Sequence, residues 1–415
     1  MSRNMSDAEI SANAVEFIKD RLYYIPLKER PVKRKRHAFF SIDDELEYWN
    51  FYLDFGPLNL GQLYRFCVIL LDILKDPALE NKKIFYYSST QSDKRANAAF
   101  LISAFAMIYL NRTPEEAFMP FRSSPPFPPF HDATPIQCTY NLTIPDCLSG
   151  LCEAMKLKYF DFNQFNVEEY EHYERVENGD FNWLVQNKFL AFAGPFEMKR
   201  DIGDGYLTLT PEDYIPYFKK NGVTLVIRLN RKCYDEKRFI RHGIKHVDLF
   251  YPDGSNPPES ILQKFLKVCE GEKGAIAVHC KAGLGRTGSC IGCYMMKHHG
   301  MTAAQAIGWM RIARPGSVIG PQQHFLQENE ARMHQEGQRY RANVLRKPKQ
   351  CNDSETKLNN NAIHEKRLML ESKEWDSESA QSLSSSSDSQ DMRIVFSQGD
   401  HLRLRKEEAR STFHK

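Results

Sequence analysis

Apolar residues along the chain alternate between long runs with helical spacing and short runs with strand character. In the first half, residues 60–76 and 93–110 are strongly apolar and predict two helices, which flank a short strand over residues 83–88. The second half has the order strand, helix, strand, helix, over residues 223–229, 258–269, 274–278 and 289–299. Strands that alternate with helices indicate an α/β fold with parallel sheets.

Charge and composition change between these halves and after them. Residues 161–180 contain seven acidic residues and one arginine. After residue 346 the chain is rich in Ser, Asn, Lys and Glu, which predicts a disordered tail over residues 347–415. The chain therefore divides into units over residues 12–160 and 181–346, an acidic linker between them, and a tail.

A cysteine and an arginine with five residues between them, Cys280 and Arg286, stand between a predicted strand and a predicted helix. This strand–loop–helix order directs backbone N–H groups and a helix N-terminus at one point, which predicts an anion site. The field that binds an anion also lowers the pKa of a thiol and makes it a nucleophile, and an arginine can hold two phosphoryl oxygens. A buried structural cysteine in a glycine-rich turn is the alternative, and His279 and Thr287 beside the loop count against it.

The loop sequence over residues 279–288 reads His-Cys-x-x-Gly-x-x-Arg-Thr-Gly. It resembles the signature of cysteine-dependent tyrosine and dual-specificity phosphatases. Together with the run Ala-Arg-Pro-Gly-Ser-Val-Ile-Gly-Pro-Gln-Gln over residues 313–323, it resembles the mitotic-exit (cell-division-cycle-fourteen) family. The resemblance covers roughly residues 12–346. It implies two tandem phosphatase-like α/β domains, a non-catalytic one over residues 12–160 and a catalytic one over residues 181–346, joined by an acidic linker helix over residues 161–180.

The first unit carries a comparable segment, in which Ser89 and Arg95 have the spacing of the cysteine and the arginine. The loop between them contains no glycine, so we expect a malformed phosphate site without a nucleophile. Coincidence between two α/β segments is the alternative to a duplication. If the duplication holds, the first domain has lost catalysis.

A phosphatase of this type needs a proton donor on a second loop, and residues 250–255 carry Asp253 between Pro and Gly just after a strand-like run. Asp253 matches the family's general acid, whereas an ordinary turn aspartate is the alternative reading. Asp235 and Asp248 are the next candidates for the acid.

The resemblance implies a mechanism in two displacements that needs no metal or other cofactor. Cys280 attacks phosphorus, Asp253 protonates the leaving oxygen, and water then hydrolyses the thiophosphate. Thr287 would assist departure of the sulfur, and His279 would fix the loop and tune the thiolate. Gln322 and Gln323 lie where related enzymes orient water, and either could serve, whereas an ordinary surface loop is the alternative reading. The phosphate would be held by the loop residues Lys281, Ala282, Gly283, Leu284, Gly285 and Arg286.

Helical spacing brings acidic residues of the linker toward one face. The resemblance implies that this face lines a groove that selects basic residues after a phosphoserine-proline pair, which would reverse cyclin-dependent phosphorylation in cell division. A solvated helix face is the alternative. The groove is predicted to comprise Glu168, Glu169, Glu171 and Asp180.

Two other functions remain open at this point. Phosphoinositide phosphatases share the loop motif, including Lys281. Leu284, however, stands where they carry a second basic residue, and the acidic linker opposes a ligand that carries several phosphates. A non-catalytic phosphopeptide-binding scaffold would be expected to lack Cys280, Arg286 or Asp253. The expected partners are therefore phosphorylated proteins and peptides, while partners of the tail are unknown.

Composition narrows the possible classes of function and location further. A net charge of +3 makes no general case for nucleic acid, and the longest apolar run, residues 98–110, is too short to span a bilayer. Ten cysteines without a signal-peptide pattern predict reduced thiols, and Cys290 and Cys293 are expected to pack as small apolar groups rather than bind metal. The basic run over residues 33–36 predicts a nuclear and cytoplasmic location, and the resemblance implies nucleolar, centrosomal and spindle associations.

Overall fold

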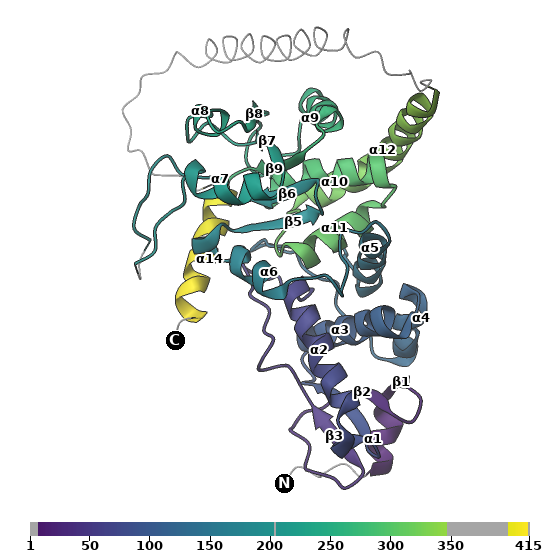
Figure 1. Ribbon diagram of the computed structural model, residues 1–415. Coiled ribbons are helices and arrows are strands. Elements are labelled where there is room, and N and C mark those ends of the chain that lie inside the picture. The colour runs from purple at the N-terminus through teal and green to yellow at the C-terminus, as the bar shows by residue number, and fades with distance from the viewer. Residues whose placement is uncertain (1–6, 203–204, 347–396, 414–415) are drawn as a thin grey trace. The chain divides into compact units, whose positions relative to one another are not determined.

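The computed structural model describes residues 7–202, 205–346 and 397–413 (Figure 1). They belong to two units, one of residues 1–337 with 397–415, and one of residues 338–396. The described part of the second unit is the end of helix α12 (Pro321–Arg346).

The first half of the chain forms a four-stranded sheet in the order β1-β2-β4-β3. Strands β2, β4 and β3 are parallel, and β1 pairs antiparallel with β2 at one edge. The strands are β1 (Val15–Ile18), β2 (Leu22–Pro26), β3 (His37–Phe40) and β4 (Lys83–Ser88). The helices are α1 (Asp7–Asn13), α2 (Leu60–Lys75), α3 (Ser92–Leu110), α4 (Pro114–Phe118) and α5 (Ile144–Lys156).

The second half forms a five-stranded sheet in the order β5-β6-β9-β7-β8. Its central strand β9 is AIAVH, buried at every position, as expected of a parallel strand covered on both faces. The strands are β5 (Phe181–Val185), β6 (Phe189–Phe192), β7 (Val223–Arg228), β8 (Lys245–Asp248) and β9 (Ala275–His279). The helices are α7 (Pro211–Lys220), α8 (Lys237–Ile240), α9 (Glu259–Gly271), α10 (Gly285–His299) and α11 (Ala303–Ala313).

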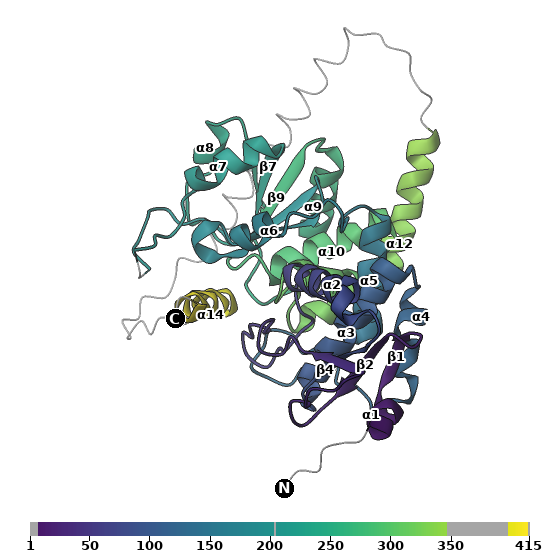
Figure 2. The ribbon, with the colours of Figure 1, turned by 60° about the horizontal axis from the view of Figure 1, so that its bottom comes forward.

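Two glycines bring the two halves into close contact between α5 and α11. A Cβ on Gly150 of α5 would lie 2.4 Å from the Gln305 carbonyl oxygen, and one on Gly308 of α11 would lie 2.9 Å from the Cys147 Cα. The indole of Trp309 then reaches β5 and donates to the Leu184 carbonyl at 2.7 Å. One continuous apolar core therefore runs through both halves, whose lobes are visible from two directions in Figures 1 and 2.

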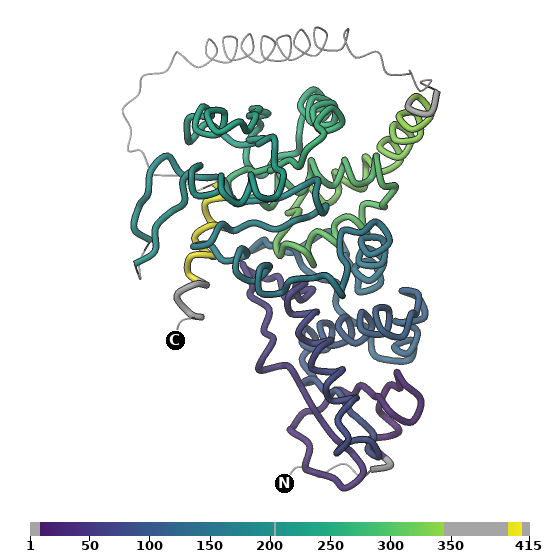
Figure 3. Tube along the Cα trace, in the orientation of Figure 1, coloured from purple at the N-terminus to yellow at the C-terminus, as the bar shows by residue number. Residues whose placement is uncertain are grey.

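This architecture confirms the predicted fold class of two tandem α/β domains. The acidic linker contains helix α6 (Val167–Glu174) and the short 3-10 turn η3 (Val176–Asn178). Residues 347–396 of the predicted tail lie outside the described residues. At the chain's end the structure differs from the expectation of disorder, because helix α14 (Gln398–Phe413) runs beside η3 (Figure 3). Among the described helices, none is long and apolar enough to cross a membrane.

Candidate active site

The loop between β9 and α10, residues 280–286, is called the thiol loop here, and its carbonyl groups are bound by the protein around it. The Cys280 carbonyl accepts from the ring of His279, and the Lys281 carbonyl accepts from the backbone of Gly194 at 3.0 Å. The next two carbonyls, of Ala282 and Gly283, both accept from Arg314 at 2.9 Å. The Leu284 carbonyl accepts from the Gly288 N–H in the first turn of α10 at 3.0 Å.

These bonds fix which way the loop amides point. The N–H and C=O of one peptide unit point in nearly opposite directions, so carbonyls that face the protein leave the N–H groups facing the centre of the loop. In the described part of the chain, none of the backbone N–H groups from Lys281 to Arg286 donates to another group. At the centre of the loop these unpaired donors and the N-terminus of α10 favour a bound anion.

Glycine is required in the loop at one position. Gly283 has a φ of +69°, and a Cβ there would lie 2.1 Å from the Phe192 carbonyl oxygen on β6. Any larger residue would therefore have to push the loop off the sheet.

The thiol of Cys280 is buried at the base of this loop, and its electrostatic surroundings favour the thiolate. Burial alone would raise the pKa of Cys280, but the Arg286 guanidinium and the Thr287 side chain outweigh it and hold the pKa below the usual value of a thiol. On the following helix, α10, burial outweighs the opposing interactions and raises the pKa of Cys290 to about 12. These interactions therefore make Cys280 easier to ionise than Cys290.

His279 is buried between two hydrogen-bond partners. Its Nδ1 lies 2.8 Å from the Cys280 carbonyl, which can only accept, so Nδ1 carries the proton. Its Nε2 then accepts from the Tyr234 hydroxyl at 2.6 Å, and that hydroxyl also contacts His246 at 2.9 Å. Burial lowers the pKa of His279 well below its usual value, so the ring is neutral and holds the loop in place.

Asp253 is the carboxylate that the structure brings to Arg286. Its Oδ1 lies 3.0 Å from Nη2 of Arg286, whose Nη1 donates to the Tyr251 carbonyl at 3.0 Å. The Arg286 Nε is buried and has no hydrogen-bond partner among the described residues, so it remains available to a phosphoryl oxygen. The other two candidate acids lie elsewhere, since Asp248 pairs with Arg228 and Asp235 accepts from the Lys237 N–H at 3.0 Å just before α8.

The side chains of Gln322 and Gln323 have different surroundings. Gln322 is buried against the thiol loop, where its Oε1 would lie 2.7 Å from a Cβ on Gly285. Gln323 turns toward the first domain, where it donates to Asp132 at 3.2 Å and accepts from Arg311. Gln322 is thus the one placed to contact a group bound in the loop.

Arg314 is a site residue that the sequence analysis did not identify. Its buried guanidinium holds two loop carbonyls, donates to the Asn182 side chain at 2.8 Å and lies 2.8 Å from Asp180 Oδ1. It therefore connects the thiol loop to the end of the acidic linker. Its position inside the run 313–323 was the only sequence signal, because no fixed spacing relates it to Cys280.

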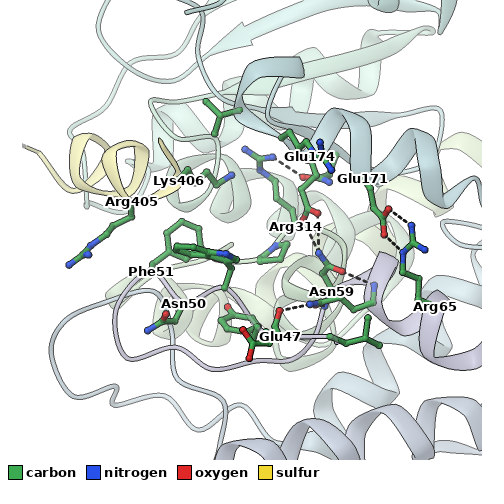
Figure 4. A pocket seen from close by; sticks show the side chains of 18 of the residues that line it. Glu47, Asn50, Phe51, Asn59, Arg65, Glu171, Glu174, Arg314, Arg405 and Lys406 are labelled. Carbon is green, nitrogen blue, oxygen red and sulfur yellow. Dashed lines mark hydrogen bonds and ion pairs between the residues drawn. The ribbon is translucent and has the colours of Figure 1, made fainter. Parts of the chain in front are cut away.

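The acidic linker borders a pocket of about 700 Å³, shown in Figure 4. Glu171 lines it and forms a bidentate pair with Arg65, and Glu174 lines it and accepts from the Asn59 side chain at 3.0 Å. Burial raises the pKa of Glu174 to about 7. Further carboxylates on the pocket wall are those of Asp44, Glu45, Glu47 and Glu177.

The predicted groove residues are thus only partly brought together. Glu171 lines the pocket, whereas Glu168 and Glu169 are exposed and do not. Glu169 instead accepts from the Tyr217 hydroxyl at 3.2 Å. Asp180 is buried, and although burial opposes ionisation, Arg314 and Lys406 hold its pKa below the usual value.

In the first domain, the carboxylate of Asp43 from another segment lies at the corresponding loop. The Ser89 N–H donates to Asp43 at 2.6 Å, and Arg95 turns away to donate to the Pro125 carbonyl at 2.9 Å. A negative charge at the loop amide opposes a bound anion, so this loop lacks the features of a phosphate site.

Comparison with known proteins agrees with this geometry. Family models described as "Dual specificity protein phosphatase, N-terminal half" and "Dual specificity phosphatase, catalytic domain" match residues 16–154 and 205–330. Dual specificity protein phosphatase CDC14C of Homo sapiens is 48% identical over 325 residues, which are 78% of this chain and 72% of the relative. The chain belongs to the CDC14 family of dual specificity protein phosphatases.

Other members are similar at higher identity over a smaller share of their length. The CDC14A proteins of Mus musculus and Homo sapiens are each 55% identical over 337 residues, or 81% of this chain. Those residues are 56% and 57% of the two relatives, so the chain spans little more than half the length of these CDC14A proteins.

Proposed function

We propose that this chain is a cysteine-dependent, metal-independent protein phosphatase that works through a cysteinyl-phosphate intermediate. One observation carries the proposal: a buried thiol of lowered pKa lies at the base of a loop whose carbonyls are bound by the protein, while its amides and the Nε of Arg286 have no partner among the described residues. Membership of the CDC14 family and the match to a catalytic-domain model support it.

In the first displacement the Cys280 thiolate attacks phosphorus, so that an S–P bond forms as the P–O bond to the Ser, Thr or Tyr side chain breaks. Arg286 and the loop amides hold the three remaining phosphoryl oxygens as charge develops. Asp253, on the acid loop (residues 250–255), gives its proton to the leaving oxygen.

In the second displacement a water molecule attacks the phosphorus of the thiophosphate. Asp253, now ionised, takes the proton of that water, and Gln322 orients it from beside Gly285. The S–P bond breaks, Thr287 stabilises the returning thiolate, and inorganic phosphate leaves.

For the substrate, we propose phosphoserine-proline sites followed by a basic residue, which implies reversal of cyclin-dependent phosphorylation. The pocket beside the linker supports this choice, because its wall carries several carboxylates and includes Arg314, which also holds two carbonyls of the thiol loop. The same charge disfavours a phosphoinositide, whose ring carries several phosphates. The nuclear and cytoplasmic location stays a prediction.

A panel of substrates on the full chain tests this proposal. Phosphoserine-proline peptides with a downstream lysine should be turned over with a higher kcat/KM than the same peptides with a downstream alanine. The difference should shrink at high salt, because screening weakens the attraction. Faster turnover of phosphoinositide vesicles than of every peptide would reverse the assignment of substrate class.

A further inference from the structure

Residues 317–323, called the glutamine segment, hold a strained backbone conformation against the thiol loop. Val318 has a φ of +61°, a left-handed conformation that a β-branched residue adopts only where its surroundings impose it. A Cβ on Gly288 would lie 2.9 Å from the Val318 side chain, and the Val318 N–H donates to the Leu284 carbonyl at 3.4 Å. Contacts of the segment with the rest of the protein therefore impose this conformation.

Gln322, within this segment, contacts both loops of the catalytic site. Its Oε1 would lie 2.7 Å from a Cβ on Gly285 in the thiol loop, and its Nε2 donates to the Ser255 carbonyl of the acid loop at 3.3 Å. The same Oε1 accepts from the Ile319 N–H at 3.1 Å. Because this last bond lies within the segment, a shift of the segment backbone would move the Gln322 side chain relative to both loops.

Asp132, a residue of the first domain, holds the glutamine segment from outside the catalytic domain. It is 1% exposed, and its Oδ2 accepts from the Gly320 N–H at 2.5 Å and from the Gln323 side chain at 3.2 Å. Its Oδ1 accepts from the Thr134 hydroxyl at 2.8 Å and lies 3.4 Å from the His131 ring. One buried carboxylate therefore joins the first domain to the backbone and a side chain of the glutamine segment.

The loop that carries Asp132 is fixed within the first domain. Phe130 and Leu142 form a backbone bridge, in which the Phe130 N–H donates to the Leu142 carbonyl at 2.7 Å. The His131 ring accepts from the Cys138 N–H at 3.0 Å, so its other nitrogen donates to the Asp132 backbone carbonyl at 2.6 Å. The carboxylate of Asp132 thus reaches the glutamine segment from a fixed position.

Arg311 of α11 binds the same segment from the catalytic domain. Its buried guanidinium donates to the carbonyls of Ser317 at 3.2 Å and Val318 at 3.1 Å, and to Oε1 of Gln323. An arginine can only donate and a carboxylate can only accept, so the Gln323 amide between Arg311 and Asp132 has one orientation. The strained backbone at Val318 is therefore held between a buried guanidinium and a buried carboxylate from different domains.

We propose that Asp132 is a positioning residue for the second displacement, through which the non-catalytic domain places the side chain of Gln322. The inference rests on the proposed function of the catalytic site. Among the described residues, the polar partners of Asp132 lie in its own loop and in the glutamine segment, and they include neither Asp253 nor Arg286. Its effect on the reaction should therefore pass through the glutamine segment.

This route makes the two displacements unequal in their dependence on Asp132. The first displacement uses the thiol loop, Arg286 and Asp253, whereas Gln322 orients the water of the second. For an aryl phosphate with a good leaving group the first displacement is fast, so hydrolysis of the thiophosphate limits kcat, while kcat/KM reports the steps up to its formation. A residue that acts through Gln322 should thus change kcat and leave kcat/KM nearly unchanged.

Steady-state kinetics of Asp132→Ala in the full chain test this split. We expect kcat for the aryl phosphate to fall at least fivefold and KM to fall by a similar factor, so that kcat/KM stays within twofold of the parent chain. Ser149→Ala is the matched control, because it removes another hydrogen bond between the domains, from Gln305 at 2.8 Å, that involves no residue of the glutamine segment. Its kcat should stay within twofold of the parent value.

A double-variant cycle tests the route through the glutamine. In a Gln322→Ala background, Asp132→Ala should lower kcat by less than twofold, because the side chain that it positions is already absent. Losses that multiply in the double variant would show that Asp132 acts independently of Gln322 and would overturn the proposal.

The outcomes separate this inference from the proposed function. A parent chain without phosphatase activity would refute the proposed function itself. In an active chain, an unchanged kcat in Asp132→Ala, or a kcat/KM that falls as far as kcat, would overturn only the positioning role. If Asp132→Ala does not fold, Asp132→Asn replaces it, since it keeps one acceptor for the Gly320 N–H. It should show the same split with at least a twofold loss of kcat, and a parent-like kcat would count against the proposal.

Discussion

The carboxylate of Asp253 lies 3.0 Å from the guanidinium of Arg286, so the candidate general acid and the phosphate-binding arginine contact each other directly. A second contact holds Arg286 in place, because the Tyr251 hydroxyl donates to the Arg286 carbonyl at 2.9 Å. A phosphoryl group held by Arg286 would therefore present its leaving oxygen close to Asp253. The pair links phosphate binding to proton transfer.

Asp253→Ala should lower kcat for phosphoserine peptides by about 10²-fold or more. An aryl phosphate with a good leaving group needs less protonation and should lose less activity, as steady-state kinetics on both substrates will show. Asp235→Ala, just before α8, is the matched control and should behave like the parent chain. Equal losses on both substrates would assign the acid to another residue.

The reactivity of Cys280 should depend on pH through the contact with Arg286. Because that contact helps hold the thiol pKa below its usual value, alkylation by iodoacetamide should remain fast below pH 9 and slow only as the pH falls through the lowered pKa. Arg286→Ala should move the midpoint upward. Cys233→Ser, which removes an exposed thiol, should leave it unchanged.

Acid should destabilise the fold through the half-buried His246. Burial lowers the pKa of His246 to about 3, so the folded state binds fewer protons than the unfolded state, whose histidine titrates near 6.5. Stability is then full above about pH 6.5 and falls as the pH drops, by about 2 kcal/mol at pH 5 from this group. Urea unfolding at pH 7 and pH 5 should show a smaller pH difference for His246→Asn than for the exposed control His242→Asn.

Glu171 should contribute to the selection of basic substrates, and Glu168 should not. Glu171→Gln should raise KM roughly two- to fivefold for peptides with a downstream lysine, as expected for a partly exposed ion pair of about 0.5–1 kcal/mol. Peptides with alanine there should be unaffected. Glu168→Gln, one turn away and outside the pocket, is the control, and equal effects of the two variants would contradict a substrate-binding role.

The first domain should remain inactive even with a thiol restored. In a Cys280→Ser background, Ser89→Cys should give no phosphatase activity, because Asp43 at the loop amide repels phosphate. Ser89→Ala in the otherwise unchanged chain should retain full turnover of phosphopeptides. Activity in the double variant that depends on the introduced thiol would contradict the assignment of a non-catalytic domain.

The parts of the site that the sequence predicted are contiguous. The thiol loop combines strand, glycines, cysteine and arginine within one short run, so its chemistry is readable from local spacing, and Asp253 stands in a recognisable turn. Arg314 and Tyr234 act through contacts with residues far away in the sequence, and no local pattern marks them. Gln322 and Gln323 are neighbours of the same type, and only packing against Gly285 distinguishes them.

The C-terminal tail shows where a prediction from composition fails. Its polar composition indicates disorder, because it cannot build a core of its own. Helix α14 instead uses apolar surface of both domains, where Leu402 meets residues drawn from four distant segments. Composition describes the structure that a segment can form alone, and it misses a binding surface that the rest of the chain provides.

Direct detection of the intermediate tests the account most directly. The full chain is mixed with a phosphoserine-proline peptide, quenched with acid within milliseconds and examined by mass spectrometry. The account predicts one added phosphoryl group on the peptide that contains Cys280, present in Cys233→Ser and absent in Cys280→Ser, which should also lose at least ~10⁴-fold in turnover. Phosphate on another residue, or turnover by Cys280→Ser within tenfold of the parent chain, would contradict it.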